Sequence, residues 1–567
     1  MTEPILLYDT TLRDGTQQEG MVLSLSDKLR IARRLDEAGF PYVEGGWPGS
    51  NPKDEEFFAL ARGTTFRTAR LAAFGSTRHR SQRAETDPNL AALLAAETPV
   101  VTIFGKSWLL HVADVLGATP EENLAMIGDS VRHLRQAGRE VIYDAEHFFD
   151  GYKADAAYAL ATLRTAIDAG ATSVVLCDTN GGCLTDEVGA ITRAVIGEVG
   201  HPVTWGIHVH NDAGLAVANS LAAVAAGVRH VQGTINGYGE RCGNANLVTI
   251  WANLALKLAR PTVPSGADLT GLTDLSRFVA DVANMTPDAY QPYVGGSAFA
   301  HKGGVHGSAT LRHQQAYQHI DPALVGGEMR LVVSELGGRA NAAWRAAQLE
   351  ELAGDAVDPL ELSRLVKRLE ADGTSFEGAE ASFELLVRRI QPGYQPPFRI
   401  LDFTVLVEQR GEANRRAEAS VRVEVNGEFH HTAADGNGPV HALDRALRKA
   451  LAAFFPVLDE IHLVDYKVRI LDGEAATAAR TRVVIETGSQ AGTWVTAGAD
   501  TNIIAASVEA LRDSFEYALL RLGPDRQRPA AVPRGGQRRP KGAAPARRRH
   551  PTGRAATVAG PSKGTPA

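Results

Sequence analysis

The sequence predicts an α/β protein, built as a (β/α)8 TIM barrel followed by helical linker subdomains and a C-terminal α+β domain. Three observations predict this order. Short apolar runs alternate with helical patterns over the first 258 residues, the next stretch has no regular strand rhythm, and a new rhythm of strands and helices begins near residue 398. With 567 residues, of which 44% are hydrophobic, the chain is long enough for two or three cores.

The barrel prediction rests on eight apolar runs that are each followed by helical periodicity. In the first helical segment, residues 26–38, Leu29, Ala32 and Leu35 share one face and Gly39 is a stop signal. A (β/α)8 barrel typically needs about 250 residues, and its active site collects at the carboxyl ends of the strands. The predicted strands are residues 5–7, 42–43, 71–74, 100–104, 141–143, 173–177, 203–207 and 228–232.

The seventh of these strands ends in two histidines one residue apart. Because residues i and i+2 of a strand point to the same face, His208 and His210 can present two imidazoles to one metal ion. The alternative is a pair of histidines that are satisfied by hydrogen bonds on the strand. The residues at the ends of neighbouring strands decide between the two.

Two further polar segments follow predicted strands. Arg13 and Asp14 come after the first strand, where a carboxylate could complete a metal site and a guanidinium could hold a carbonyl or a developing oxyanion. The alternative for this pair is a turn with a surface ion pair. After the eighth strand, residues 236–244 form a glycine-spaced polar loop. In a barrel these segments converge at one face.

These motifs resemble those of the acyl-CoA condensing enzymes and lyases that share a metal-dependent barrel. Residues 9–15, Asp-Thr-Thr-Leu-Arg-Asp-Gly, and residues 208–212, His-Val-His-Asn-Asp, are the two hallmarks. Within this family, residues 42–54 and residues 300–306 are similar to the citramalate synthases in particular. The resemblance extends from residue 5 to about residue 522.

The resemblance implies an acyltransferase that carries out a Claisen condensation. Acetyl-CoA loses a methyl proton, the enolate attacks the ketone of pyruvate, and thioester hydrolysis releases CoA and (R)-citramalate, a precursor for isoleucine biosynthesis. It also implies a divalent metal ion, with Asp14, His208, His210 and, by family match, Asn244 as ligands. This ligand set suits zinc, manganese, cobalt or magnesium to differing degrees.

The remaining site residues are also assigned by resemblance. Arg13 would stabilise the alkoxide, Glu146 would act as the base with His306 as its partner, Tyr317 would close the site, and Thr179 would donate its hydroxyl to the keto-acid carboxylate. The alternatives are a Glu146 that only orients another ligand and a Thr179 that caps a helix. His306 and Tyr317 lie outside the barrel, and in related enzymes this segment comes from the partner subunit, so the resemblance implies a homodimer.

Four domains are predicted. They are a catalytic barrel over residues 1–258, helical linker subdomains over 259–395, an allosteric and dimerisation domain over 396–523, and a disordered tail over 524–567.

The third domain is predicted to contain a strand-strand-helix unit twice. Its helices are expected at residues 440–455 and 502–522, each entered through a small-residue turn whose helix N-terminus attracts carboxylates. The resemblance implies that it binds an amino-acid end product, with isoleucine as the expected effector. The alternative is a dimerisation domain without a ligand. The predicted strands are residues 400–407, 419–425, 461–470, 482–487 and 493–497.

The tail, residues 524–567, has almost no apolar residues and is expected not to fold. Its eleven Lys or Arg residues and one Asp give it a net charge of about +10, which leaves about −17 on the rest of the chain from the overall −7. Loose nucleic-acid binding through phosphates is the alternative to a solvated appendage. We expect the appendage, because no aromatic residue is interleaved for stacking.

The composition predicts a cytoplasmic protein. Its three cysteines, Cys177, Cys183 and Cys242, are too few for a disulfide framework. No stretch is apolar enough to span a membrane, and the N-terminus lacks a targeting pattern.

Several other functions are compatible with a barrel of this kind. A carbon-carbon lyase or aldolase has no need of the C-terminal domain, and a non-catalytic effector-binding protein has no need of an intact set of polar residues at the strand ends. A 2-isopropylmalate or homocitrate synthase would differ only in the volume of its keto-acid pocket.

Overall fold

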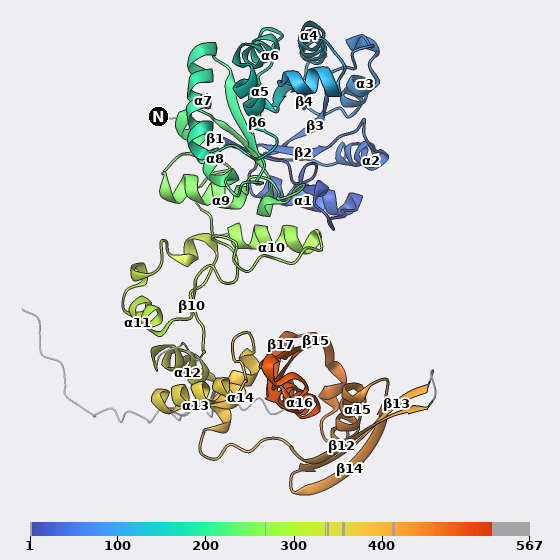
Figure 1. The fold of residues 1–567 in the computed structure, drawn as a ribbon, viewed down its shortest axis with the longest axis vertical. Helices are drawn as coiled ribbons and strands as arrows, with labels where there is room; N and C mark the ends of the chain where they lie inside the picture. Colours follow the sequence, from blue (N-terminus) through green and yellow to red (C-terminus); the bar gives the residue numbers. More distant parts are fainter. Residues whose placement is uncertain are drawn as a thin grey trace, which may run out of the picture.

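The computed structural model describes residues 3–266, 268–334, 336, 339–353, 358–410 and 414–523. Figure 1 shows the barrel at one end of the long axis and two smaller sheets with their helices at the other end. The linker helices of residues 272–312 lie between them, and those of residues 339–389 lie beside the two sheets. The predicted basic tail, residues 524–567, lies outside the described residues. In the described part of the chain, no helix combines the length and the apolarity that crossing a membrane requires.

The predicted barrel is confirmed. Each strand is parallel to the next, and β1 pairs with both β8 and β2, through Leu6 with His230 and Tyr8 with Tyr42, so the sheet closes. The strands are β1 (Ile5–Asp9), β2 (Tyr42–Gly46), β3 (Arg70–Ser76), β4 (Val100–Lys106), β5 (Glu140–Glu146), β6 (Ser173–Asp178), β7 (Thr204–Val209) and β8 (His230–Gly233).

Helices surround the barrel. The first begins where the side chain of Ser24 accepts from the backbone N–H of Asp27, and the chain leaves it through Gly39, whose φ of +87° suits glycine. Ala32 and Leu35 on its inner face are fully buried. The helices are α1 (Leu25–Glu37), α2 (Pro52–Ala61), α3 (Pro88–Ala95), α4 (Pro120–Gln136), α5 (Phe148–Ala154), α6 (Ala156–Asp168), α7 (Thr185–Val199), α8 (Ala216–Ala226) and α9 (Leu247–Ala252).

The linker is mainly helical, as predicted, and contains short strands. A strand, β9, pairs with β1, and another short pair, β10 with β11, holds the middle of the linker together. Leu272 and Leu275 of α10 are buried in the same apolar core as the barrel. The elements are β9 (Thr262–Val263), α10 (Leu272–Val282), β10 (Ala300–His301), α11 (Gly304–Arg312), β11 (Arg330–Leu331), α12 (Arg339–Ala353), α13 (Pro359–Ala371) and α14 (Glu380–Arg389).

The last part of the chain repeats one unit twice, but the predicted strand-strand-helix unit is wrong. Each unit has three antiparallel strands before its helix. The strand missed in the first unit is β14, whose residues are all exposed or half-buried, so it has no apolar run. The elements are β12 (Arg399–Arg410), β13 (Asn414–Val425), β14 (Glu428–Gly436), α15 (Pro439–Leu451), β15 (His462–Ile470), β16 (Thr481–Ser489), β17 (Gly492–Asp500) and α16 (Ile503–Leu522).

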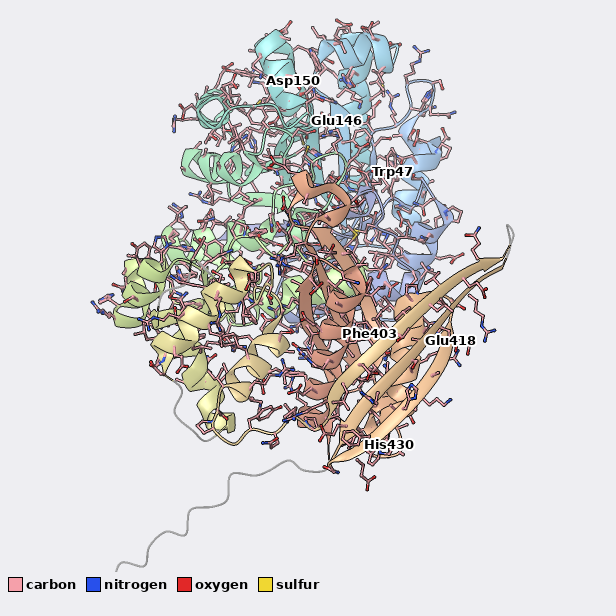
Figure 2. The ribbon with its side chains drawn as sticks, turned by 60° about the horizontal axis from the view of Figure 1, so that its bottom comes forward. Trp47, Glu146, Asp150, Phe403, Glu418 and His430 are labelled. Carbon is pink, nitrogen blue, oxygen red and sulfur yellow. The ribbon has the colours of Figure 1, made fainter. Side chains whose placement is uncertain are left out.

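The two sheets pack their helices into one core, with Leu447 of α15 and Leu511 of α16 among its buried side chains. Figure 2 shows the first sheet as a long curved ribbon that carries Phe403, Glu418 and His430 on its three strands.

A buried group of charges joins the linker to this core. The guanidinium of Arg389 in α14 donates to Asp513 (2.7 Å) and Glu516 (2.5 Å) of α16, and the hydroxyl of Tyr394 donates to Glu516 (2.6 Å). Both carboxylates are almost fully buried. Because a buried charge without its partner is costly, this group ties α14 firmly to α16.

Candidate active site

Three side chains from the carboxyl ends of two barrel strands form a compact cluster. Asp14 follows β1, His208 lies near the end of β7, and His210 follows that strand. The Nε2 atoms of the two histidines are 3.3 Å apart and lie 3.2 Å and 3.9 Å from Oδ2 of Asp14. One ligand atom of each residue lies within 4.8 Å of the others, and all three residues are buried. Two imidazoles and a carboxylate at this spacing fit one divalent metal ion.

A fourth oxygen ligand is available beside them. An isolated antiparallel bridge pairs His210 with Asn244, and the amide nitrogen of Asn244 donates to the carbonyl of Tyr238 (3.1 Å). This bond leaves Oδ1 of Asn244 buried and without a hydrogen-bond partner. Since buried polar atoms are normally satisfied, an unpartnered oxygen beside a histidine cluster fits a metal ligand.

The local charges keep Asp14 and His210 in the forms that bind metal, whereas without a metal ion they favour the protonated form of His208. Burial alone raises the pKa of Asp14, but Arg13 and the two histidines hold it well below its ordinary value, so the carboxylate is ionised. Burial and the neighbouring His208 lower the pKa of His210 to about 4, which keeps this imidazole neutral. For His208, burial lowers the pKa, but the bond to Asp14 outweighs it and the pKa is raised.

Arg13 is held between two carboxylates and an aromatic ring. Its Nη1 lies 3.1 Å from Oδ2 of Asp14, and its Nε donates to Oε2 of Glu44 at 2.5 Å. The carbon centre of its guanidinium lies 3.7 Å from the ring centroid of Phe74. Glu44 in turn accepts from the hydroxyl of Tyr8 (2.9 Å). The sequence prediction did not assign Glu44, although a carboxylate inside the apolar strand β2 was a visible signal.

The ends of β4, β5 and β6 add further polar groups. Glu146 forms an ion pair with Lys106, and within the described residues it does not contact the metal cluster. The hydroxyl of Thr179 accepts from the backbone N–H of His147 (2.9 Å), so its own hydrogen stays available to a ligand. Thr179 does not cap α7, which begins at Thr185. The sequence prediction did not assign Lys106 or Asp144. Asp144 lies on β5 two residues before Glu146, so the two carboxylates share one face of the strand.

An aromatic group from β3, β4 and the turn after β2 lies next to these polar groups. The ring of Trp47 packs edge-on against Phe74 (5.8 Å between centroids) and Phe104 (5.6 Å), and the two phenylalanines stack at 5.5 Å. Lys106 lies over Phe104 at 5.3 Å, next to its partner Glu146. Phe74 therefore joins this aromatic group to Arg13, and Phe104 joins it to Lys106.

His306 and Tyr317 lie together but apart from the cluster. They belong to the linker, in and just after α11, and their rings stack at 4.2 Å between centroids. His306 is exposed and Tyr317 is 46% exposed. Among the described residues of the single chain, no hydrogen bond, ion pair or ring contact joins either side chain to Asp14, His208 or His210.

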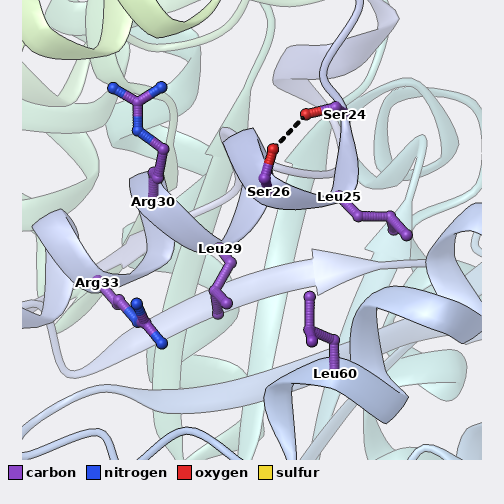
Figure 3. A pocket seen from close by; sticks show the side chains of 7 residues that line it. All are labelled: Ser24, Leu25, Ser26, Leu29, Arg30, Arg33 and Leu60. Atoms are coloured by element: carbon purple, nitrogen blue, oxygen red, sulfur yellow. Dashed lines mark hydrogen bonds between the residues drawn. The ribbon is translucent and has the colours of Figure 1, made fainter.

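Two hollows show where the surface is open. One, of about 610 Å³, is lined by residues 17–19 and 236–243 and reaches the loop that carries Asn244. The other, of about 660 Å³, lies on the outer surface between α1 and α2, where Figure 3 shows Leu29, Arg33 and Leu60 around it. Neither hollow is lined by a candidate site residue.

Comparisons with known proteins agree with this arrangement. The HMGL-like family matches residues 4–279, the homocitrate synthase post-HMGL domain-like family matches residues 293–371, and the LeuA allosteric (dimerisation) domain matches residues 377–519. The chain is 50% identical over 527 residues to the (R)-citramalate synthase of Aquifex aeolicus, covering 92% of this chain and 99% of that protein.

Two further relatives show that the chain is more similar to citramalate synthases than to a 2-isopropylmalate synthase. The (R)-citramalate synthase of Geobacter sulfurreducens is 51% identical over 519 residues, which cover 91% of this chain and 97% of that protein. A 2-isopropylmalate synthase of Methylorubrum populi is 31% identical over 515 residues, covering 89% of this chain and 94% of that protein. The similarity is thus greater to the first group of synthases, as the sequence motifs predicted.

Removal of one candidate ligand is expected to weaken metal binding. Asp14→Asn or His208→Ala should raise the dissociation constant for Mn²⁺ by a factor of about 10 or more, because either change removes one of few ligands. The measurement is titration of the metal-free protein with Mn²⁺, followed by electron paramagnetic resonance of the free ion. His201→Ala, a change at an exposed histidine before β7, is the matched control. Unchanged affinity in both cluster variants would contradict the site.

Proposed function

Because the chain belongs to the family of (R)-citramalate synthases, condensing transferases with an HMGL-like barrel, we propose that it joins acetyl-CoA to pyruvate. The products are citramalate and CoA, and the product serves isoleucine biosynthesis. In this reaction a methyl carbon of acetyl-CoA loses a proton and forms a bond to the ketone carbon of pyruvate. Water then cleaves the thioester and releases the thiol.

The observation that carries this proposal is the cluster of Asp14, His208 and His210 with Arg13 beside it. A divalent ion held there, whether manganese, zinc, cobalt or magnesium, would act as a Lewis acid on the keto acid. Asn244 would supply the fourth protein ligand through its unpartnered Oδ1. The ion pair of Arg13 with Asp14 supports a shared role for these neighbours at one substrate.

Arg13 is proposed to bind the ketone oxygen and to stabilise the negative charge that develops on it. Glu44 and Phe74 fix its position through one hydrogen bond and one ring face, so the donors that remain can point at a ligand. Thr179 is proposed to donate its free hydrogen to the carboxylate of the keto acid, since its oxygen already accepts from a backbone N–H.

Glu146 is proposed as the base that removes the methyl proton, with His306 as its partner. The position of Glu146 at the end of β5 supports this role, because the active site of a barrel lies at the carboxyl ends of its strands, and the ion pair with Lys106 holds the carboxylate in place. Tyr317, stacked on His306, is proposed to close the site.

The aromatic group beside Arg13 supports a small keto acid. Trp47, Phe74 and Phe104 are in mutual ring contact, and Phe74 lies against Arg13. With the ketone oxygen on Arg13, a side chain larger than the methyl group of pyruvate would meet these rings. The lower identity to a 2-isopropylmalate synthase points the same way.

A thiol-release assay with acetyl-CoA tests the proposal. Among pyruvate, 2-oxobutyrate, 2-oxoisovalerate and 2-oxoglutarate, pyruvate is expected to give the highest kcat/KM, by about tenfold or more over 2-oxoisovalerate, since surplus methyl groups clash with a rigid aromatic surface. Phe104→Ala should narrow that ratio, and Leu60→Ala on the outer surface of α2 is its control. A preference for 2-oxoisovalerate or 2-oxoglutarate would instead make the chain a 2-isopropylmalate or homocitrate synthase.

The active unit is proposed to be a homodimer. His306 and Tyr317 are stacked and largely exposed on the linker, far along the chain from the residues with which they are proposed to act. A second copy whose linker covers the barrel rim would bring them to Glu146. The match of residues 377–519 to a dimerisation domain supports such a copy.

Mixing two inactive variants tests the dimer. His306→Ala and Asp14→Asn should each lack activity, but a heterodimer contains one site with both changes and one with neither. After complete subunit exchange at equal amounts, activity should return to about one quarter of wild type, because half of the dimers are mixed and each has one intact site. If native mass spectrometry confirms exchange and no activity returns, His306 does not act across the dimer.

The last domain is proposed to bind isoleucine as an inhibitor. Helix N-termini attract carboxylates, and the two units differ at this point. Asn502 caps α16 by accepting from the N–H groups of Ile504 and Ala505. In contrast, α15 begins at Pro439, and the preceding Gly438 provides no side-chain cap. The N–H groups at the start of α15 are therefore the better candidates for the effector carboxylate.

A negative charge placed at the start of α15 should weaken binding of the effector. His441→Glu, in the first turn of α15, is expected to raise the dissociation constant of isoleucine by about tenfold, because two carboxylates would compete for the same N–H groups. Ile503→Glu, the same kind of change at the capped start of α16, is the control. Calorimetric titration of the full chain measures both. If isoleucine, leucine and valine do not bind the unmodified chain, the domain serves dimerisation alone.

A further inference from the structure

We propose that Gln232 and Asp144 are positioning residues that fix which nitrogen of His208 faces the metal site. The inference rests on the proposed metal site and concerns two residues that do not themselves reach it. Both lie on barrel strands, Gln232 on β8 and Asp144 on β5, and both are buried.

A chain of hydrogen bonds leads from the carboxylate to the imidazole. The amide nitrogen of Gln232 donates to Oδ1 of Asp144 at 3.0 Å. The amide oxygen of Gln232 lies 2.9 Å from Nδ1 of His208. The opposite ring nitrogen, Nε2 of His208, lies 3.2 Å from Asp14 and 3.3 Å from the other histidine. This series of hydrogen bonds therefore ends at the metal cluster.

The direction of each bond follows from the chemistry of the groups. An ionised carboxylate can only accept, so the amide group of Gln232 must turn its nitrogen towards Asp144. Its oxygen then faces His208, and because an amide oxygen can only accept, Nδ1 of His208 must carry a hydrogen. A neutral imidazole has one N–H, which leaves the lone pair on Nε2, the atom that points into the cluster.

The opposite orientation of the Gln232 amide would prevent His208 from binding metal through Nε2. If the amide were reversed, its nitrogen would donate to Nδ1 of His208 and the ring hydrogen would move to Nε2, where it would point at the metal. The carboxylate of Asp144 thus determines the tautomer of His208 across the intervening amide. Histidines that bind metals are commonly oriented in this way by a group on the second nitrogen.

Only one of the two histidines is held by such a chain. Nδ1 of His210 is buried and has no hydrogen-bond partner, so no neighbouring group fixes the tautomer of His210 through this nitrogen. The two ligands are therefore unequal: His208 is oriented by side chains of β5 and β8, whereas His210 is placed by the backbone bridge to Asn244. Loss of Gln232 should consequently affect binding through His208 alone.

A packing role for Gln232 makes a different prediction from an orienting role. Gln232→Leu keeps the approximate shape and apolar contact but removes both hydrogen bonds. The exchange variant Asp144→Asn with Gln232→Glu keeps the total charge and the direction of the bond from His208, because the new carboxylate at position 232 still accepts from Nδ1 of His208. The bond between positions 144 and 232 reverses, since the new amide at position 144 donates to that carboxylate. A residue that only fills space has no reason to respond differently to these two changes.

Mn²⁺ titration of the metal-free full chain tests the inference. At pH 8, above the pKa of about 7 to which burial raises Asp144, its carboxylate only accepts. Gln232→Leu should weaken Mn²⁺ binding by about 10- to 100-fold, and Asp144→Asn should weaken it less. The exchange variant should bind within about threefold of wild type. Ser173→Ala, a buried hydroxyl of β6 that contacts His230 instead, is the matched control and should bind as wild type.

The outcomes separate the inference from the proposed function. If wild type does not bind Mn²⁺, the metal site itself is wrong. If wild type binds and Gln232→Leu binds equally well, or if the exchange variant is as weak as Gln232→Leu while circular dichroism shows both folded, the orienting role is wrong. Weakening by Gln232→Leu with recovery in the exchange variant supports it.

Discussion

The parallel pairing of β1 with both β2 and β8 is the contact on which the candidate site depends. It closes the sheet, so that strands separated by some 200 residues of sequence become neighbours. Asp14 after β1 then meets His208 and His210 at the end of β7, and the loop after β8 brings Asn244 beside them. An open sheet made of the same strands would leave these ligands at opposite edges.

Closure of the barrel also brings charged side chains together in its buried interior. Arg13 lies between Asp14 and Glu44, and each of these groups is nearly or completely buried. Burial raises the pKa of Asp144 and of Asp9 to about 7, whereas the cations near Asp14 keep that carboxylate ionised. The barrel interior thus contains carboxylates of unequal acidity, because the surrounding cations outweigh burial at Asp14, whereas burial outweighs the other effects at Asp144 and Asp9.

Beyond the barrel, the chain is joined by contacts of two kinds. Apolar side chains of α10 continue the barrel core, so the first part of the linker is fixed to the barrel. At its other end the linker is fixed by charge, since Arg389 of α14 is bound to Asp513 and Glu516 of α16. Separation of α14 from α16 would therefore be costly, because it would remove the guanidinium of Arg389 from two buried carboxylates.

The local signals for the barrel were strong in the sequence. Each strand was marked by an apolar run and was followed by helical periodicity, as in residues 26–38 with Gly39 as a stop signal. These signals depend only on neighbours along the chain. The paired histidines were visible for the same reason, since two residues on a strand share a face whatever surrounds them. The third strand of the first C-terminal unit was not visible, because β14 has no buried face.

What the sequence by itself determined is the fold class, the order of its parts and the motifs at the strand ends. Only the tertiary structure brought Glu44 to Arg13 and placed Gln232 between Asp144 and His208, since these contacts join strands that are 24 to 88 residues apart along the chain. A glutamine within an apolar strand gives no local sign of its partners. Its role is fixed by which side chains the closed barrel places within hydrogen-bonding distance, and that depends on the register of all eight strands together.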